Sequence, residues 1–187
     1  ALIGRINGWM ADSTPGQLIY HPYISDAGER GPFINATARA SLIGLTQSHR
    51  FADVMRAVIE GLGMATRDCY DAMGPLPPEV RLTGGAARSS ALRGVLAAAV
   101  GCPTRVSSRE EAGAAGAAMI GAVAIGAYPD MAACIADWVT PTLGPAEANS
   151  AELSTLYARH YKTYRKARLA LEPVWDSFSK TQDTQDA

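Results

Sequence analysis

The residues best suited to chemistry lie in one stretch, 80–90, where a short apolar run ends at two glycines and a helical pattern follows. Gly84 and Gly85 have no Cβ, so the edge of a flat ligand can lie directly against their backbone. The helix that follows offers free amide groups and the positive end of its dipole, with Ser89 as the expected N-cap. Nucleotide sites are commonly built from a strand, a tight glycine turn and a helix in this order.

The same residues also fit an ordinary loop between a strand and a helix, in which glycine is needed only for the backbone conformation of the turn. Short glycine motifs often match by chance. From this stretch alone, both interpretations stay open.

Other reactive side chains lack the spacing of a metal or catalytic site. Three cysteines and three histidines are scattered along the chain (Cys69, Cys102, Cys134, His21, His49 and His160). Without a C-x-x-C pair or closely spaced histidines, neither zinc nor a redox motif is indicated. We expect no metal site, and reduced cysteines in the core of a cytoplasmic protein.

Composition favours a small-molecule partner. The chain has 187 residues, a net charge of -1 and a pI near 6.3. It therefore lacks the basic field that nucleic acid or an anionic membrane surface would require. Its length suits one domain with an extension. It does not begin with Met and shows no signal-peptide pattern, which is consistent with a fragment.

The elements that must position the glycine turn alternate between strands and helices, which indicates an α/β fold. Periodicity and chain breakers give these boundaries (strands 17–20, 40–45, 79–82 and 104–107; helices 53–73, 90–100, 112–128 and 129–137, and a last helix from 149). The unit from 79 to 107 is typical of a right-handed parallel crossover. Residues 112–128 are uncharged but rich in Ala and Gly, so we expect a buried helix and no membrane span.

Local signals set the expected helix ends. Ser108 with Glu111, and Asn149 with Glu152, fit capping boxes that would begin two helices. Arg56 and Glu60 are one turn apart and are expected to pair on the exposed face of their helix, worth only about 0.2–0.5 kcal/mol.

The C-terminal region is expected to be a linker, a helix and a tail. Residues 140–145 are interpreted as the linker, Pro173 as the helix end and 181–187 as disordered. One face of the helix carries a stripe that we expect to pack on the domain (Leu153, Tyr157, Tyr161 and Tyr164). The other face is expected to be exposed to solvent (Lys162, Arg165, Lys166 and Arg168).

Three blocks in order resemble the C-terminal domain of the FGGY carbohydrate kinases. Residues 21–39 are similar to the family's PYLSGERxPxxDPxARG stretch, with Asp26-Ala27 inserted and Asn35 in place of the usual aspartate. Residues 40–60 fit its second signature at every constrained position. Residues 82–89 resemble its GGGAKSPLW turn, with Thr83 replacing the first glycine, and residues 111–118 resemble the EASALGAA helix.

The resemblance implies a ribonuclease-H-like lobe of the actin, Hsp70 and hexokinase superfamily, incomplete at its N-terminus. Residues 1–140 would be part of the ATP-binding domain. Residues 141–187 would be a linker, a C-terminal helical extension and a disordered tail. The missing strands would leave a sheet edge open, to be covered by an upstream segment or another chain.

By the same resemblance, the full protein phosphorylates a sugar or polyol hydroxyl with MgATP. The nucleotide would be held by the glycine turn, with adenine against the two glycines (Thr83, Gly84, Gly85, Ala86 and Ser89). The catalytic aspartate, the sugar contacts and the Mg²⁺ contacts would lie upstream, so we expect no catalytic residue in this chain and no turnover by it alone. Its partners would be the N-terminal lobe and the substrate, with a homodimer left open.

Residues 20–33 resemble the corresponding stretch of pentulose or tetritol kinases more than that of glycerol kinase. An alternative is a non-catalytic nucleotide-binding or assembly module of the same superfamily. An aspartate in a Gly-Asp context upstream would favour the kinase.

Overall fold

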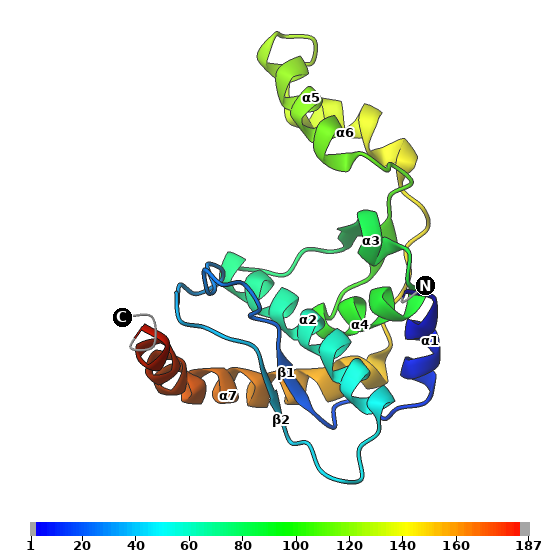
Figure 1. The fold of residues 1–187 in the computed structure, drawn as a ribbon. Helices are drawn as coiled ribbons and strands as arrows, with labels where there is room; N and C mark the ends of the chain where they lie inside the picture. The colour runs from blue at the N-terminus through cyan, green and yellow to red at the C-terminus, as the bar shows by residue number, and fades with distance from the viewer. Residues whose placement is uncertain (1–2, 184–187) are drawn as a thin grey trace.

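The computed structural model describes residues 3–183, in which helices and short strands alternate as expected (Figure 1). The first half contains α1 (Ile3–Ala11), β1 (Ile19–His21), β2 (Ser41–Ile43), α2 (Phe51–Met73), β3 (Val80–Leu82) and α3 (Gly84–Ala87). The second half contains α4 (Ser90–Val100), β4 (Thr104–Val106), α5 (Ala112–Ala124), α6 (Met131–Trp138), the 3-10 turn η1 (Thr140–Thr142) and α7 (Ala151–Asp183).

Two pairs of strands flank the helices. β1 and β2 are antiparallel, and Ile19 pairs with Ile43. β3 and β4 are parallel, with Val80 beside Thr104, so the predicted strand-helix-strand unit with a parallel return is confirmed. The segment 140–145, which is expected to be a linker, contains η1. Residues 143–147 lie along the free edge of β4, where Leu143 and Glu147 form antiparallel bridges. Ladder hydrogen bonds hold this segment in place.

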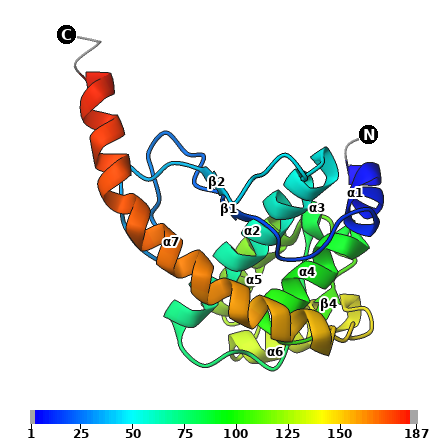
Figure 2. The ribbon, with the colours of Figure 1, turned by 90° about the horizontal axis from the view of Figure 1, so that it is seen from below.

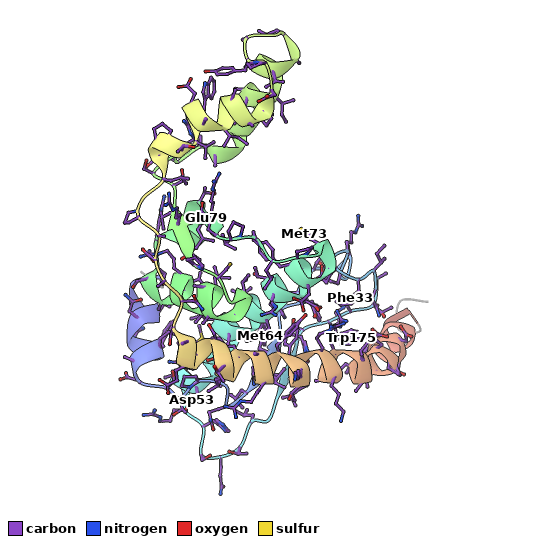
Figure 3. The ribbon with its side chains drawn as sticks, turned by 180° about the vertical axis from the view of Figure 1, so that it is seen from behind. Phe33, Asp53, Met64, Met73, Glu79 and Trp175 are labelled. Atoms are coloured by element: carbon purple, nitrogen blue, oxygen red, sulfur yellow. The ribbon has the colours of Figure 1, made fainter. Side chains whose placement is uncertain are left out.

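The core lies where α2 packs on α4, α7 and β1 (Figures 1 and 2). Gly61 of α2 allows this close approach, since a Cβ there would lie 2.3 Å from the backbone oxygen of Tyr20. Figure 3 shows Met64 in the interior of this helical layer, and its side chain is 1% exposed. The tyrosine stripe of α7 is buried against the same core, as predicted (Tyr157, Tyr161 and Tyr164).

Arg56 and Glu60 do not pair on an exposed face as expected. Both are buried, and Arg56 Nη1 lies 3.2 Å from Glu60 Oε1 beneath α1 and the 12–16 loop. The sequence spacing gave the pair correctly, but chain segments far away in sequence cover it. Arg168, which is expected on the solvent-exposed face of α7, is likewise buried. Its guanidinium group pairs with the buried carboxylate of Asp68 at 2.6 Å.

Neither expected capping box forms. α5 begins at Ala112 without a side-chain cap, and the Ser108 hydroxyl instead donates to the backbone oxygen of Thr142. Ser150, rather than Asn149, caps α7 by accepting from the amide of Leu153 at 3.3 Å. A tertiary contact therefore occupies the Ser108 hydroxyl at α5, and the neighbouring serine provides the cap at α7.

The α5 helix is not buried as predicted. Only Met119 of α5 is buried, while Ile120 and Ile125 are 63% and 83% exposed. Figure 1 shows the α5–α6 hairpin projecting from the helical layer. Asp130 begins α6 by accepting from the amide of Ala133 at 2.8 Å.

Pro173 does not end the last helix. α7 continues through it to Asp183, as one long helix in Figure 2. An interior proline costs about 3 kcal/mol, and packing beyond it offsets that cost, since Trp175 is buried edge-on against Tyr23. Trp175 and Phe33 lie at the same end of α7 (Figure 3). Of the expected disordered tail, 181–183 are helical and 184–187 lie outside the described residues.

Candidate functional site

The glycine stretch folds as strand, turn and helix. β3 ends at Leu82, Thr83 is extended, and Gly84 takes a φ of +68°, which favours glycine. The loop contains one helical turn, α3, before α4 begins. Ser89 caps α4 as predicted, because its hydroxyl oxygen accepts from the amide of Leu92 at 3.3 Å.

Nothing within the described chain requires glycine at position 85. Its φ is not positive, and a Cβ at this position would meet no atom within 4 Å. Glycine in a helical turn costs about 0.5–1 kcal/mol relative to alanine, with no packing gain here to offset it. Gly85 and Gly84 are both exposed.

A pocket of about 200 Å³ opens beside Gly84, between α3 and the loop from β4 to α5. Its walls come from both segments (Gly84, Ala87, Arg88, Val106, Ser107, Ser108, Arg109 and Glu110). The parallel pairing of β3 and β4 brings the two loops together, because the carboxyl ends of neighbouring parallel strands lie at the same edge of a sheet.

Hydrogen bonds fix the second wall. The amide of Ser107 donates to the backbone oxygen of Leu82 at 3.0 Å, which joins this wall to the end of β3. The hydroxyls of Ser107 and Thr142 are 2.9 Å apart. Arg109 donates from Nη2 to the backbone oxygen of Trp138 at 2.6 Å. The wall is thus held by β3, η1 and α6 together.

The first wall is fixed from behind by Arg93 of α4. Its Nη1 donates to the backbone oxygen of Ala87 at 2.6 Å. Its Nε and Nη2 bond both oxygens of Glu147, at 2.7 and 2.9 Å. This two-point pairing orients the guanidinium group rigidly, so the end of α3 is held in place before any ligand arrives.

Of the expected site residues, Gly84 is found in the pocket lining. Thr83 and Gly85 are its chain neighbours and are not part of that lining. Ser89 is 4% exposed, and its hydroxyl serves the α4 cap. Sequence reasoning missed the second wall, 106–110, although the predicted parallel crossover was a signal that β4 would end beside β3.

Among residues 3–183, no group of three or more His, Cys, Asp or Glu side chains could hold a metal ion. The three cysteines are free thiols, two of them buried. No helix in the described part of the chain is long and apolar enough to cross a membrane.

Comparison with known proteins gives one family. Residues 6–125 match the FGGY family of carbohydrate kinases, C-terminal domain. The chain is 62% identical to an erythritol kinase of Brucella abortus (strain 2308) over 178 residues, which are 95% of this chain and 34% of that relative. It is 32% identical to a gluconokinase of Bacillus subtilis (strain 168) over 74% of this chain and 28% of that relative. It thus spans about a third of the length of these curated relatives.

Solved structures show the same fold. A gluconate kinase from Lactobacillus acidophilus superposes with a TM-score of 0.82 at 24% identity, over 94% of this chain and 36% of that one. A glycerol kinase from Plasmodium falciparum, solved with ADP, superposes with a TM-score of 0.67 at 16% identity, over 89% of this chain and 34% of that one. The α/β fold described above therefore corresponds to about a third of each of these kinases.

Proposed function

The chain belongs to the FGGY family of carbohydrate kinases, matching its C-terminal domain, and on that premise we propose that the whole protein phosphorylates a small polyol with ATP. Erythritol is the proposed acceptor. The observation that carries this proposal is the 62% identity to an erythritol kinase across 95% of the chain. The gluconokinase and xylulose kinase relatives are 41% identical or less and match shorter parts of the chain.

The pocket beside Gly84 is the proposed site for the adenine end of ATP. The bare backbone of Gly84 and Gly85 would lie against the base, and Ser107–Glu110 would form the opposite wall. Pockets that enclose a drug-sized ligand measure about 300–1,000 Å³, whereas this one holds about 200 Å³. The volume suits a nucleobase, so the phosphates would extend out of the pocket. Thr83, Ala86 and Ser89 would support the turn around the base.

The catalytic aspartate and the Mg²⁺ contacts are proposed to lie in parts of the whole protein outside this chain. Phosphoryl transfer needs a carboxylate to orient the attacking hydroxyl, and Mg²⁺ supplies charge neutralisation on the phosphates. Among the described residues that line the pocket there is one carboxylate, Glu110, on an exposed loop. The residues described here would bind and orient the nucleotide base, and this chain alone would not turn over.

The rest of a ribonuclease-H-like lobe is proposed to cover the open edge of β3. Within the described residues β3 pairs only with β4, whereas parallel sheets are normally extended and covered on both faces. We assign residues 1–140 to the ATP-binding domain and 141–187 to its extension. A cytoplasmic location is proposed with them, since ATP is the phosphoryl donor and the three cysteines are free thiols.

A coupled ADP-release assay on the full-length protein tests the proposal. Erythritol, ribulose, xylulose and glycerol would each be added at saturating MgATP, and erythritol should give the highest kcat/KM. Stimulation by another of these acceptors alone would reject erythritol but keep the kinase. If no acceptor stimulates turnover while ATP still binds, the non-catalytic nucleotide-binding alternative is correct.

A further inference from the structure

A second concave surface lies between α2 and α7 and shares no residue with the pocket beside Gly84. Its volume is about 580 Å³, and it is open to solvent. Its lining is rich in cations (Arg67, Asp71, Ala158, Tyr161, Lys162, Arg165, Lys166 and Leu169). We call it the α2–α7 groove.

Two of the acidic groups at this groove are already neutralised. Asp71 bonds the Nε of Arg67 at 2.7 Å. Asp68, buried behind the groove, bonds the Nη1 of Arg168 at 2.6 Å and the hydroxyl of Tyr161 at 2.6 Å. Arg165 is farther from Asp68, at 3.5 Å, and its side chain is 50% exposed.

Three cations are left without a full partner. Lys162 and Lys166 are exposed, and their side chains make no hydrogen bond or ion pair within residues 3–183; Arg165 lies between them in sequence. Lys162 and Lys166 are one helical turn apart, a spacing at which like charges repel by a few tenths of a kcal/mol, roughly. The whole chain has a net charge of -1, so this positive charge is local to the groove.

The floor of the groove is rigid. The guanidinium groups of Arg67 and Arg165 lie 5.5 and 5.9 Å from the centre of the Tyr161 ring. Arg67 also donates to the backbone oxygens of Ala99 and Val100 at the end of α4. Three helices therefore hold Arg67 and Arg165 in place, whereas the side chains of Lys162 and Lys166 extend from α7 into solvent.

The geometry points to the α2–α7 groove as a binding site for a small organic phosphate, held by Lys162, Lys166 and Arg165. A phosphate dianion matches several converging cations better than a single carboxylate does. Because guanidinium groups already occupy the Tyr161 ring, the ligand is recognised by charge and not by aromatic stacking. The groove is open to solvent, and its volume of about 580 Å³ has room for a molecule of metabolite size. This inference is independent of the acceptor of the kinase and of the nucleotide pocket.

Calorimetric titration of 3-phosphoglycerate into the full-length protein tests it, with a non-hydrolysable ATP analogue and Mg²⁺ at saturation to block the nucleotide site. One saturable site per chain is expected. Glycerate, which lacks the phosphate, should bind at least tenfold more weakly. The double variant Lys162→Ala/Lys166→Ala should weaken 3-phosphoglycerate binding at least tenfold.

A matched variant controls for total charge. Arg30→Ala/Arg159→Ala removes two exposed cations outside the groove and should leave the affinity within twofold. Equal weakening in both double variants would show nonspecific attraction and overturn the inference. So would the absence of saturable binding, the result expected if another part of the whole protein fills the groove. Circular dichroism of each variant confirms that it is folded.

Discussion

The hydroxyl of Tyr157 in α7 donates a hydrogen bond of 2.9 Å to Oε1 of Glu60 in α2, across 97 residues of sequence. Both side chains are buried. Glu60 also accepts from the amide of Gly16 at 3.0 Å and pairs with Arg56 at 3.2 Å. Burial, followed by the negative charge of Glu60, raises the pKa of Tyr157 well above its usual value, so the phenol stays a donor. One carboxylate thus joins α7, α2 and the 12–16 loop.

Tyr157→Phe should destabilise the fold by about 1.5–3 kcal/mol, the range for a hydrogen bond to a charged group. The phenylalanine keeps the packing but leaves a buried carboxylate oxygen short of a donor. Urea denaturation monitored by circular dichroism measures the change. Tyr70→Phe is the control, because that hydroxyl makes no hydrogen bond within the described residues and its removal should cost under about 0.5 kcal/mol. Equal costs would mean that the Tyr157 bond contributes nothing.

Gly61→Ala should be strongly destabilising, by several kcal/mol, roughly, because the added Cβ would lie 2.3 Å from the backbone oxygen of Tyr20 and force α2 away from β1. Gly94→Ala is its matched opposite within a helix. A Cβ there meets no atom within 4 Å, so stability should rise by about 0.5–1 kcal/mol from helix propensity. Differential scanning calorimetry measures the stability of both variants. Gly61→Ala should lower the melting temperature and Gly94→Ala should raise it, and a shift in the same direction would contradict the prediction.

Stability should fall as the pH drops below about 6.5. His21 is fully buried, and burial lowers its pKa below 6.5, while the hydrogen bond to the backbone oxygen of Tyr164 opposes this lowering in part. Arg168 adds to the lowering. Burial also lowers the pKa of His160. Below this pH the unfolded chain therefore binds protons that the folded chain does not. The contribution of the neutral histidines to the free energy of unfolding is fully present above pH 6.5 and decreases as the pH falls below it.

Below its unfolded pKa, each such histidine lowers the free energy of unfolding by up to about 1.4 kcal/mol per pH unit. Urea midpoints measured between pH 7.5 and pH 5 give the slope. His21→Gln should flatten it even if the variant is less stable throughout. An unchanged slope would show that His21 is not held neutral by its burial.

Gly85→Val should raise the KM for ATP of the full-length protein about tenfold or more and leave the fold intact. The chain itself has room for the side chain, since nothing lies within 4 Å of the Cβ position, whereas a base lying on the backbone would collide with it. Steady-state kinetics at saturating acceptor measure KM, and thermal melting verifies folding. With Gly94→Ala as a reference, an unchanged KM would remove this turn from the nucleotide site.

Local sequence predicted much of the fold because its signals act over a few residues. The helical period of α2, the glycine that ends α4 at Gly101 and the cap at Ser89 are short-range features, and all three appear in the structure. The order of motifs also indicated the family, which the comparisons confirm. The glycine turn was identified in the same way, although its contact with a nucleotide stays a prediction.

Tertiary contacts decided the rest, because burial depends on what arrives from elsewhere in the chain. Arg56 and Glu60 have the spacing of a surface pair, yet α1 and α7 cover them. Pro173 is a helix breaker locally, but packing of Trp175 against Tyr23 keeps α7 continuous. The second wall of the pocket beside Gly84 exists only because β4 pairs in parallel with β3. Sequence alone determined most of the helices and strands and the family, because those signals are local, and long-range packing determined which charges are buried and which loops meet.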